Sequence, residues 1–158
     1  MTRLSTYNAA TMTVTVTEAV TLNSKDYGST QSFTAANIAN VSKRMVTVTT
    51  TEAAVLSFAA AAAAGTHVIA NVQYIRFTNL DDTNHIVLTF VNEDDDEFAV
   101  KLDKGRTFIL ATDVSGGGAD MIDAKDSALS LSLGDLKSVT ADADTASCDM
   151  EIFVAETA

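Results

Sequence analysis

Hydrophobic and polar positions alternate with a period of two along most of the chain. Residues 12–17 alternate apolar and hydroxyl side chains, and residues 45–49 repeat the same alternation. Successive side chains of a strand point to opposite faces, so this pattern predicts strands with one buried face. Threonine, which fills the polar positions, is itself a β-branched strand former. The first third of the chain is therefore predicted to contain two similar strands.

The segment between these two strands has a different composition. Residues 23–42 are polar and rich in Ser, Thr and Asn, with a turn candidate at Asp26-Tyr27-Gly28. We interpret the segment as a long loop or an extended arm. A long structureless stretch is unusual inside a compact domain, which favours a role in contacting a neighbour. The predicted division is an N-terminal strand and extended arm over residues 1–42, followed by a β-sandwich domain over residues 43–158.

Residues 51–65 are the one region where a helix competes with a strand. Ala59 to Ala64 have the highest helix propensity available, and Gly65 could end a helix. The flanking segments nevertheless have the pattern of strands. A short helix or helical turn and a strand both remain open here.

The second half of the chain carries a regular series of short apolar segments separated by turn residues. The Asp103-Lys104-Gly105 sequence fits a three-residue hairpin loop with Gly in the left-handed position. We predict an antiparallel meander over the first four of these segments, a loop rich in Gly, an alternating strand and a final strand. The segments in this order are residues 74–80, 85–91, 97–102, 106–110, 115–119, 129–133 and 149–154.

Short strands with turn signals every 8 to 12 residues indicate an all-β protein. The predicted fold is an antiparallel sandwich of jelly-roll or immunoglobulin-like type with an extended N-terminal arm.

Two of the predicted strands are apolar on both faces. Val87 and Val91 lie opposite the apolar set of their own strand, and Tyr74 and Leu80 lie opposite that of theirs. A second apolar face needs a cover. Either the protein's own loops or arm cover it, or it forms an interface with another subunit or a partner. The sequence leaves both possibilities open.

The charge excludes two classes of partner. The chain has 10 Lys and Arg against 21 Asp and Glu, for a net charge of −11. Nucleic-acid backbones and anionic membrane surfaces both select clustered cations, so neither is an expected partner. The start of the sequence lacks the apolar segment of a secretory signal, and residues 53–64 are too short and too Ala-rich to span a bilayer. We therefore expect synthesis in a reducing cytoplasm.

The residues with reactive side chains form no catalytic pattern. The acidic run at residues 93–97 lacks the spacing of a calcium loop and is interpreted as a solvated turn. His67 and His85 are too far apart in sequence for a metal motif, and Cys148 has no neighbouring base and is expected to be a buried thiol. The sequence also lacks G-x-S-x-G. We predict no enzymatic activity, no metal and no cofactor.

Three segments carry a resemblance to a known class of proteins. They are Tyr74-Ile-Arg-Phe-Thr-Asn-Leu80, residues 98–110 with an L-x-x-G-x-T-F hairpin, and residues 150–155. Together these segments, which span residues 72–155, resemble small virion structural proteins of tailed bacteriophages, nearest to capsid decoration (cement) proteins. Many of those proteins are jelly-roll or immunoglobulin-like sandwiches that form trimers. The resemblance implies a homotrimer on the virion capsid surface, made in the host cytoplasm, with the major capsid protein as its partner.

The predicted contact surface combines the arm with the second apolar face. Its residues are Asn23, Tyr27, Phe33 and Ile38 of the arm, and Tyr74, Leu80, Val87 and Val91 of the sandwich. The alternative function is a tail- or fibre-associated sandwich module that binds a host surface ligand. Recognition of a glycan would need an exposed aromatic platform, and the chain has no Trp.

Overall fold

The computed structural model describes residues 8–111, 120–121 and 134–158. The expected loop at 115–119 and the expected strand at 129–133 lie outside these residues. Within them, the elements are β1 (Ala10–Glu18), β2 (Thr21–Leu22), β3 (Lys25–Asp26), β4 (Ser29–Val48), β5 (Ala53–Ala59), β6 (His67–Val68), the 3₁₀ helix η1 (Ile69–Asn71), β7 (Val72–Asn79), β8 (Ile86–Asn92), β9 (Glu97–Leu102), β10 (Thr107–Leu110), β11 (Asp120–Met121), β12 (Gly134–Ala143) and β13 (Cys148–Thr157).

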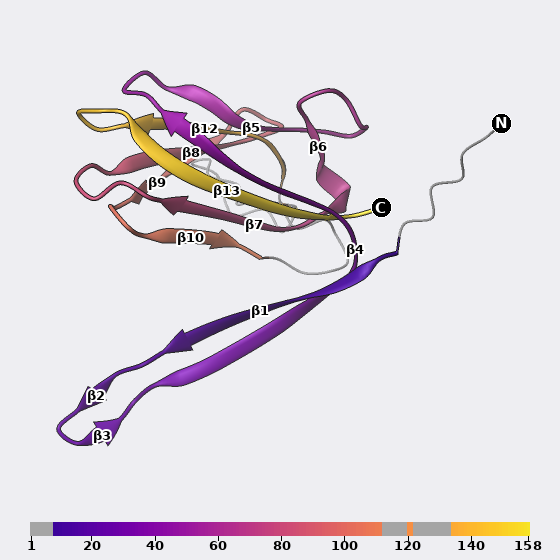
Figure 1. Ribbon diagram of the computed structural model, residues 1–158. Coiled ribbons are helices and arrows are strands. Elements are labelled where there is room, and N and C mark those ends of the chain that lie inside the picture. The colour runs from indigo at the N-terminus through magenta and orange to yellow at the C-terminus, as the bar shows by residue number, and fades with distance from the viewer. Residues whose placement is uncertain (1–7, 112–119, 122–133) are drawn as a thin grey trace, which may run out of the picture.

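Most of these strands form two sheets packed face to face (Figure 1). One sheet has the order β1-β4-β13-β7-β10, and the other has the order β6-β5-β12-β8-β9, with the short β11 paired to β12. Most connections of the body that lie within the described residues cross from one sheet to the other, as in a jelly roll. The predicted all-β antiparallel sandwich is confirmed, and the strand order is that of its jelly-roll form.

The predicted antiparallel meander is wrong. Of its four strands, only β8 and β9 form a hairpin with each other. β7 lies in the opposite sheet, where it pairs with β13 and β10. Gly105 does take the left-handed conformation, with φ of 64°, but its turn connects β9 in one sheet to β10 in the other. An alternating pattern fixes which face of a strand is buried and leaves its partner undetermined. The partners come from the distant C-terminal strands β12 and β13, which no local signal indicates.

The helix considered for residues 51–65 is replaced by the strand β5. Val55, Leu56 and Phe58 of this strand are buried in the core. Burial of three large side chains outweighs the intrinsic helix preference of a few alanines, which amounts to tenths of a kcal/mol per residue. No helix among the described residues is long and apolar enough to cross a membrane.

The core fills the space between the two sheets. Phe90 is its aromatic centre: its ring stacks on Phe98 at 4.8 Å between ring centroids and meets the edge of Phe77 at 5.9 Å. Ile75 and Ile152, on the neighbouring strands of the five-stranded sheet, are fully buried beside them. This packing fixes the relative positions of the strands that carry the candidate partner-binding surfaces.

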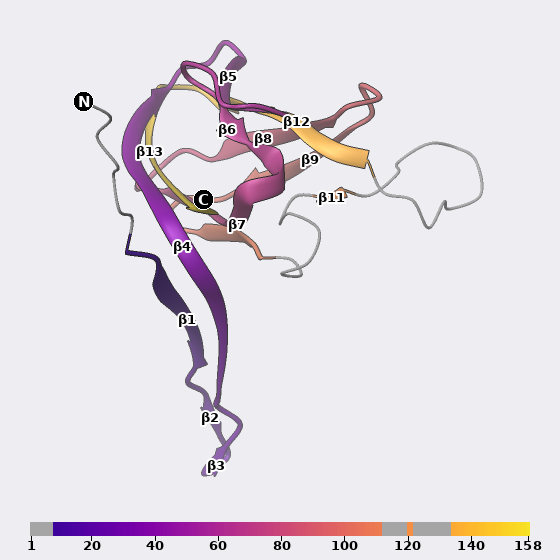
Figure 2. The ribbon, with the colours of Figure 1, turned by 90° about the vertical axis from the view of Figure 1, so that its right-hand side faces the viewer.

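A hairpin arm, residues 10–38, projects from the sandwich and consists of β1, β2, β3 and the first half of β4 (Figures 1 and 2). The first half of β4 pairs with β1, and the second half pairs with β13. The change of partner occurs at Ile38, where the register of both ladders is irregular and Asn37 has a positive φ of 60°. The segment expected to be a loop or an arm is thus a two-stranded arm. The boundary predicted at residue 42 falls inside the continuous strand β4.

Candidate partner-binding surfaces

The two faces of the hairpin arm differ in chemistry. On one face, Val14 lies opposite Phe33, and Met12 lies opposite Ala35. On the other face, hydroxyl side chains stand opposite one another, and the Thr15 and Ser32 hydroxyl oxygens are 3.1 Å apart. The alternation of the sequence produces this division directly, since side chains two residues apart share a face. One face can therefore bind apolar surface, while the other is well hydrated.

The tip of the arm is a tight hairpin. Asn23 and Ser24 both have positive φ, of 50° and 61°, between the paired strands β2 and β3. This is the conformation of a two-residue type I′ turn, in which Asn is favoured. Asn23 therefore has a structural role in the turn. Around it, Val20, Leu22 and Tyr27 are more than half exposed, and Lys25 lies over the Tyr27 ring at 5.1 Å.

The base of the arm packs on the outer face of the five-stranded sheet, the face turned away from the six-stranded sheet. The Tyr74 ring lies 6.3 Å from the Phe33 ring and 5.8 Å from the Phe153 ring, measured between centroids. Ala35, Ile38 and Ala155 complete this second buried cluster. Burial raises the pKa of the Tyr74 hydroxyl, although the nearby Arg76 charge works in the opposite direction. The arm itself covers the second apolar face at Tyr74, which is 5% exposed.

The predicted contact residues do not form one surface. Tyr27 lies at the tip of the arm, and Phe33 and Ile38 lie at its base, the latter buried. Leu80 is exposed just after β7. Val87 and Val91 are half-buried on the outer face of the six-stranded sheet, because Ile86, Leu88 and Phe90 of the same strand face the core. That face lies on the opposite side of the sandwich from Tyr74.

Other exposed apolar residues were not singled out from the sequence. Val41 and Met45 of β4 lie on the outer face of the five-stranded sheet, and Val16, Val20 and Leu22 lie on the arm. The available signal was their spacing of four residues, which places Val41 and Met45 on the same face of a strand. Their exposure could not be deduced, because it depends on β4 lying at the margin of the body.

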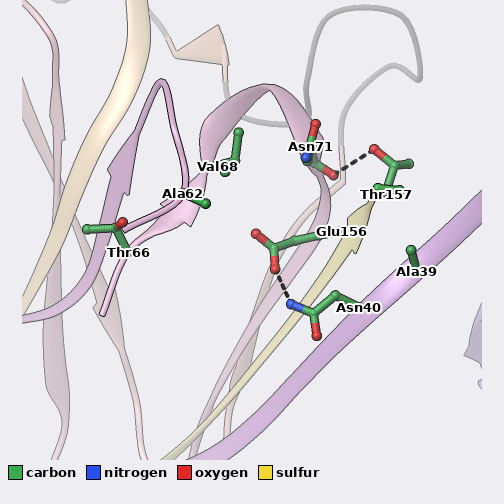
Figure 3. Close-up of a pocket in the computed structure, with 9 residues that line it drawn as sticks. Ala39, Asn40, Ala62, Thr66, Val68, Asn71, Glu156 and Thr157 are labelled. Atoms are coloured by element: carbon green, nitrogen blue, oxygen red, sulfur yellow. Dashed lines mark hydrogen bonds between the residues drawn. The ribbon is translucent and has the colours of Figure 1, made fainter. Parts of the chain in front are cut away.

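A pocket of about 550 Å³ opens beside the base of the arm (Figure 3). Its buried carboxylate, Glu156, accepts a hydrogen bond from the Asn40 side chain at 2.7 Å. The second carboxylate oxygen of Glu156 lies 3.1 Å from Nδ1 of His67 on β6. Glu156 is the only acidic side chain among the described residues that line the pocket, and both of its carboxylate oxygens thus have protein partners. The arrangement joins β4, β13 and β6 at one end of the sandwich.

The remaining groups with potential chemistry are engaged in structure. Oδ1 of Asn92 accepts hydrogen bonds from the backbone N–H groups of Asp94 and Asp96, which shapes the acidic turn. His85 lies 3.3 Å from Asp144, and burial raises the pKa of the Cys148 thiol. In the part of the chain that the structure describes, no group of three or more His, Cys, Asp or Glu residues could hold a metal ion.

No known protein family matches the chain, and no curated protein matches it either. Among solved structures, a similar chain comes from Bacillus endospore appendages, described as a novel family of disulfide-linked pili. The identity is 7%, the TM-score is 0.39, and the alignment covers 99% of this chain and 96% of that chain. A similarity this low leaves function to be argued from the chain itself.

Proposed function

We propose that this chain is a virion structural protein that decorates and stabilises an assembled bacteriophage capsid by binding the major capsid protein. The observation that carries the proposal is the hairpin arm, which projects from a jelly roll (Figure 2). The arm presents exposed apolar side chains at its tip. The resemblance of residues 72–155 to decoration proteins supplies the kind of partner.

The construction of the arm suits a clamp that reaches a neighbouring subunit. Its base is fixed by the packing of Phe33 on Tyr74, and its tip is set by the type I′ turn at Asn23 and Ser24. A contact surface held in this way loses little conformational entropy on binding. Binding to the assembled shell in preference to free subunits would stabilise the shell by mass action.

The test shortens the arm and leaves its base intact. Val16 lies opposite Gln31, so residues 17–30 can be replaced by Asn-Gly, which closes a two-residue turn at that point. The variant lacks Val20, Leu22 and Tyr27 and keeps the residues that cover Tyr74. We expect it to lose co-sedimentation with capsids assembled without this chain by about tenfold or more in affinity.

A matched control keeps the whole arm and changes an exposed apolar residue of the body that lies outside the predicted contact set, Val41→Ala. It should co-sediment as the unmodified chain does, and both variants should keep the unfolding transition of the sandwich. Equal capsid binding by the shortened and the unmodified chain would contradict the proposal.

A further inference from the structure

Two long strand edges have no partner strand among the described residues. β1 pairs with β4 on one side only, so its other edge is open from Ala10 to Glu18. β4 has β1 on one side over Ser29–Ile38 and β13 on the other side from Ile38 onward. On the side of β1, β4 is therefore open from Ala39 to Val48. We call this stretch the free edge of β4.

The open edge of β1 lacks the features that prevent strands from pairing with other chains. Folded proteins protect such edges with Pro, charged side chains or short strands. The chain has no Pro, and β1 is a nine-residue strand whose only charged residue is Glu18 at its end. A two-stranded ribbon exposed in this way is marginally stable alone, and a third strand would stabilise it.

Exposed large apolar side chains occur on the same two parts of the molecule. Among the described residues they lie either on the hairpin arm or on the outer face of the five-stranded sheet and its margin. On the sheet, Val41 and Met45 lie on β4 itself, directly beside its free edge. The described part of the six-stranded sheet contributes none. The exposed apolar side chains of the described residues are thus divided between the projecting arm and the margin of the five-stranded sheet.

The two edges are similar in length and carry side chains of opposite charge. β1 has nine residues and the free edge of β4 has ten, each about 30 Å long at about 3.3 Å per residue. β1 alternates apolar with polar side chains along its length, and the free edge of β4 does so over residues 39–42 and 46–48. β1 carries the negative Glu18, whereas the free edge of β4 carries the positive Lys43 and Arg44. The same chain already shows this pairing in part, because β1 is antiparallel to the first half of β4.

We propose that the open edge of β1 in one copy of this chain adds, as an antiparallel strand, to the free edge of β4 in a second copy. The apolar side chains of β1 then lie beside Val41 and Met45. This contact goes beyond the capsid-binding function and requires no capsid. It joins different surfaces of the two copies, so it closes into a ring or extends into a filament.

Two variants test the two sides of the contact. Val16→Lys places a cation on the open strand of β1, and Met45→Lys places one beside the free edge of β4, near Lys43 and Arg44. We expect the unmodified chain to self-associate in sedimentation velocity and each variant to be monomeric, with affinity reduced by about tenfold or more. Leu80→Lys is the control, because Leu80 is 47% exposed and Val16 is 44% exposed. It should assemble as the unmodified chain does.

Mixing the two variants distinguishes this contact from general loss of solubility or folding. Val16→Lys retains an intact β4 edge, and Met45→Lys retains an intact β1 edge, so an equimolar mixture should form dimers and nothing larger. Monomers in that mixture, or an unmodified chain that is monomeric at every soluble concentration, would overturn the proposal. In the latter case the edge is covered by the chain itself or binds a different protein.

The shortened arm of the capsid test retains β1 to Val16 and should still self-associate, so the two proposals can fail separately.

Discussion

Asn79 shows how one buried polar side chain organises a turn between the two sheets. Its Nδ2 group donates hydrogen bonds to the carbonyl oxygens of Asn84 and Leu102, and its Oδ1 accepts one from the backbone N–H of Asp81. The residue is completely buried at the end of β7. Asp81 in turn accepts backbone hydrogen bonds from Asn84 and Thr83, which lower the pKa of its carboxyl group. The β7–β8 turn thus depends on an amide that reaches across it.

We predict that Asn79→Ala lowers the free energy of unfolding by about 2–4 kcal/mol, because it removes hydrogen bonds to one buried and two part-buried backbone groups. Thr83→Ala, at an exposed position in the same turn, should change it by about 0.5 kcal/mol or less. Urea unfolding of both variants provides the measurement. An Asn79 variant as stable as the Thr83 variant would show that water replaces the amide without loss.

At the scale of elements, the outer face of the five-stranded sheet is linked by charge across three strands. Glu151 of β13 lies 3.0 Å from the Lys43 ammonium of β4 and 2.5 Å from the Arg76 guanidinium of β7. Hydrogen bonds from Lys43 and then Arg76 lower the pKa of the Glu151 carboxyl group. The folded state therefore holds this carboxylate ionised at a lower pH than the unfolded chain does.

A lowered folded pKa has a definite consequence for stability. Glu151 contributes stability that is present above its unfolded pKa and is lost as the pH falls through its folded pKa. We predict that Glu151→Gln is less stable than the unmodified chain at pH 7 and that the difference disappears in acid. Urea unfolding across that range measures it, with Glu97→Gln on the edge strand β9 as the control. A difference that is independent of pH would mean that packing, and not charge, is responsible.

Strands could be predicted from the sequence far better than their pairing. The positions of β1, β7, β8 and β9 follow from alternation, because burial on one face imposes it locally. The partners β12 and β13 follow from contacts that join distant parts of the chain, and a period of two contains no information about them. The same limit applies to the predicted contact surface. The strands that contain Tyr74 and Val87 each have a second apolar face, but only the topology places those two faces on opposite sides of the sandwich.

At the scale of the whole molecule, the chain combines a sandwich and a hairpin arm, which differ in how much of their structure is buried. The sandwich surrounds a continuous aromatic and aliphatic core, in which Phe77 and Phe90 are essentially inaccessible. The hairpin arm has a buried base and an exposed distal part, where both faces of β1 and β4 contact solvent. Cooperative unfolding of the core and local opening of the arm should therefore have different free energies.

Amide hydrogen exchange tests this division in the monomeric Val16→Lys variant. We predict that amides in the distal arm, at Thr17 and Thr30, exchange through local opening at free energies of about 0–2 kcal/mol. Amides of Ile152 and Val154 in the central strand β13 should exchange only when the whole sandwich unfolds, because both edges of β13 are paired and its inner face is buried. In the self-associating chain, protection of β1 should rise with concentration. Protection of β13 should rise as well, because association of the folded chain raises the free energy of unfolding the whole sandwich. Uniform protection of arm and core in the monomer would instead show that the arm unfolds only together with the core and does not open separately.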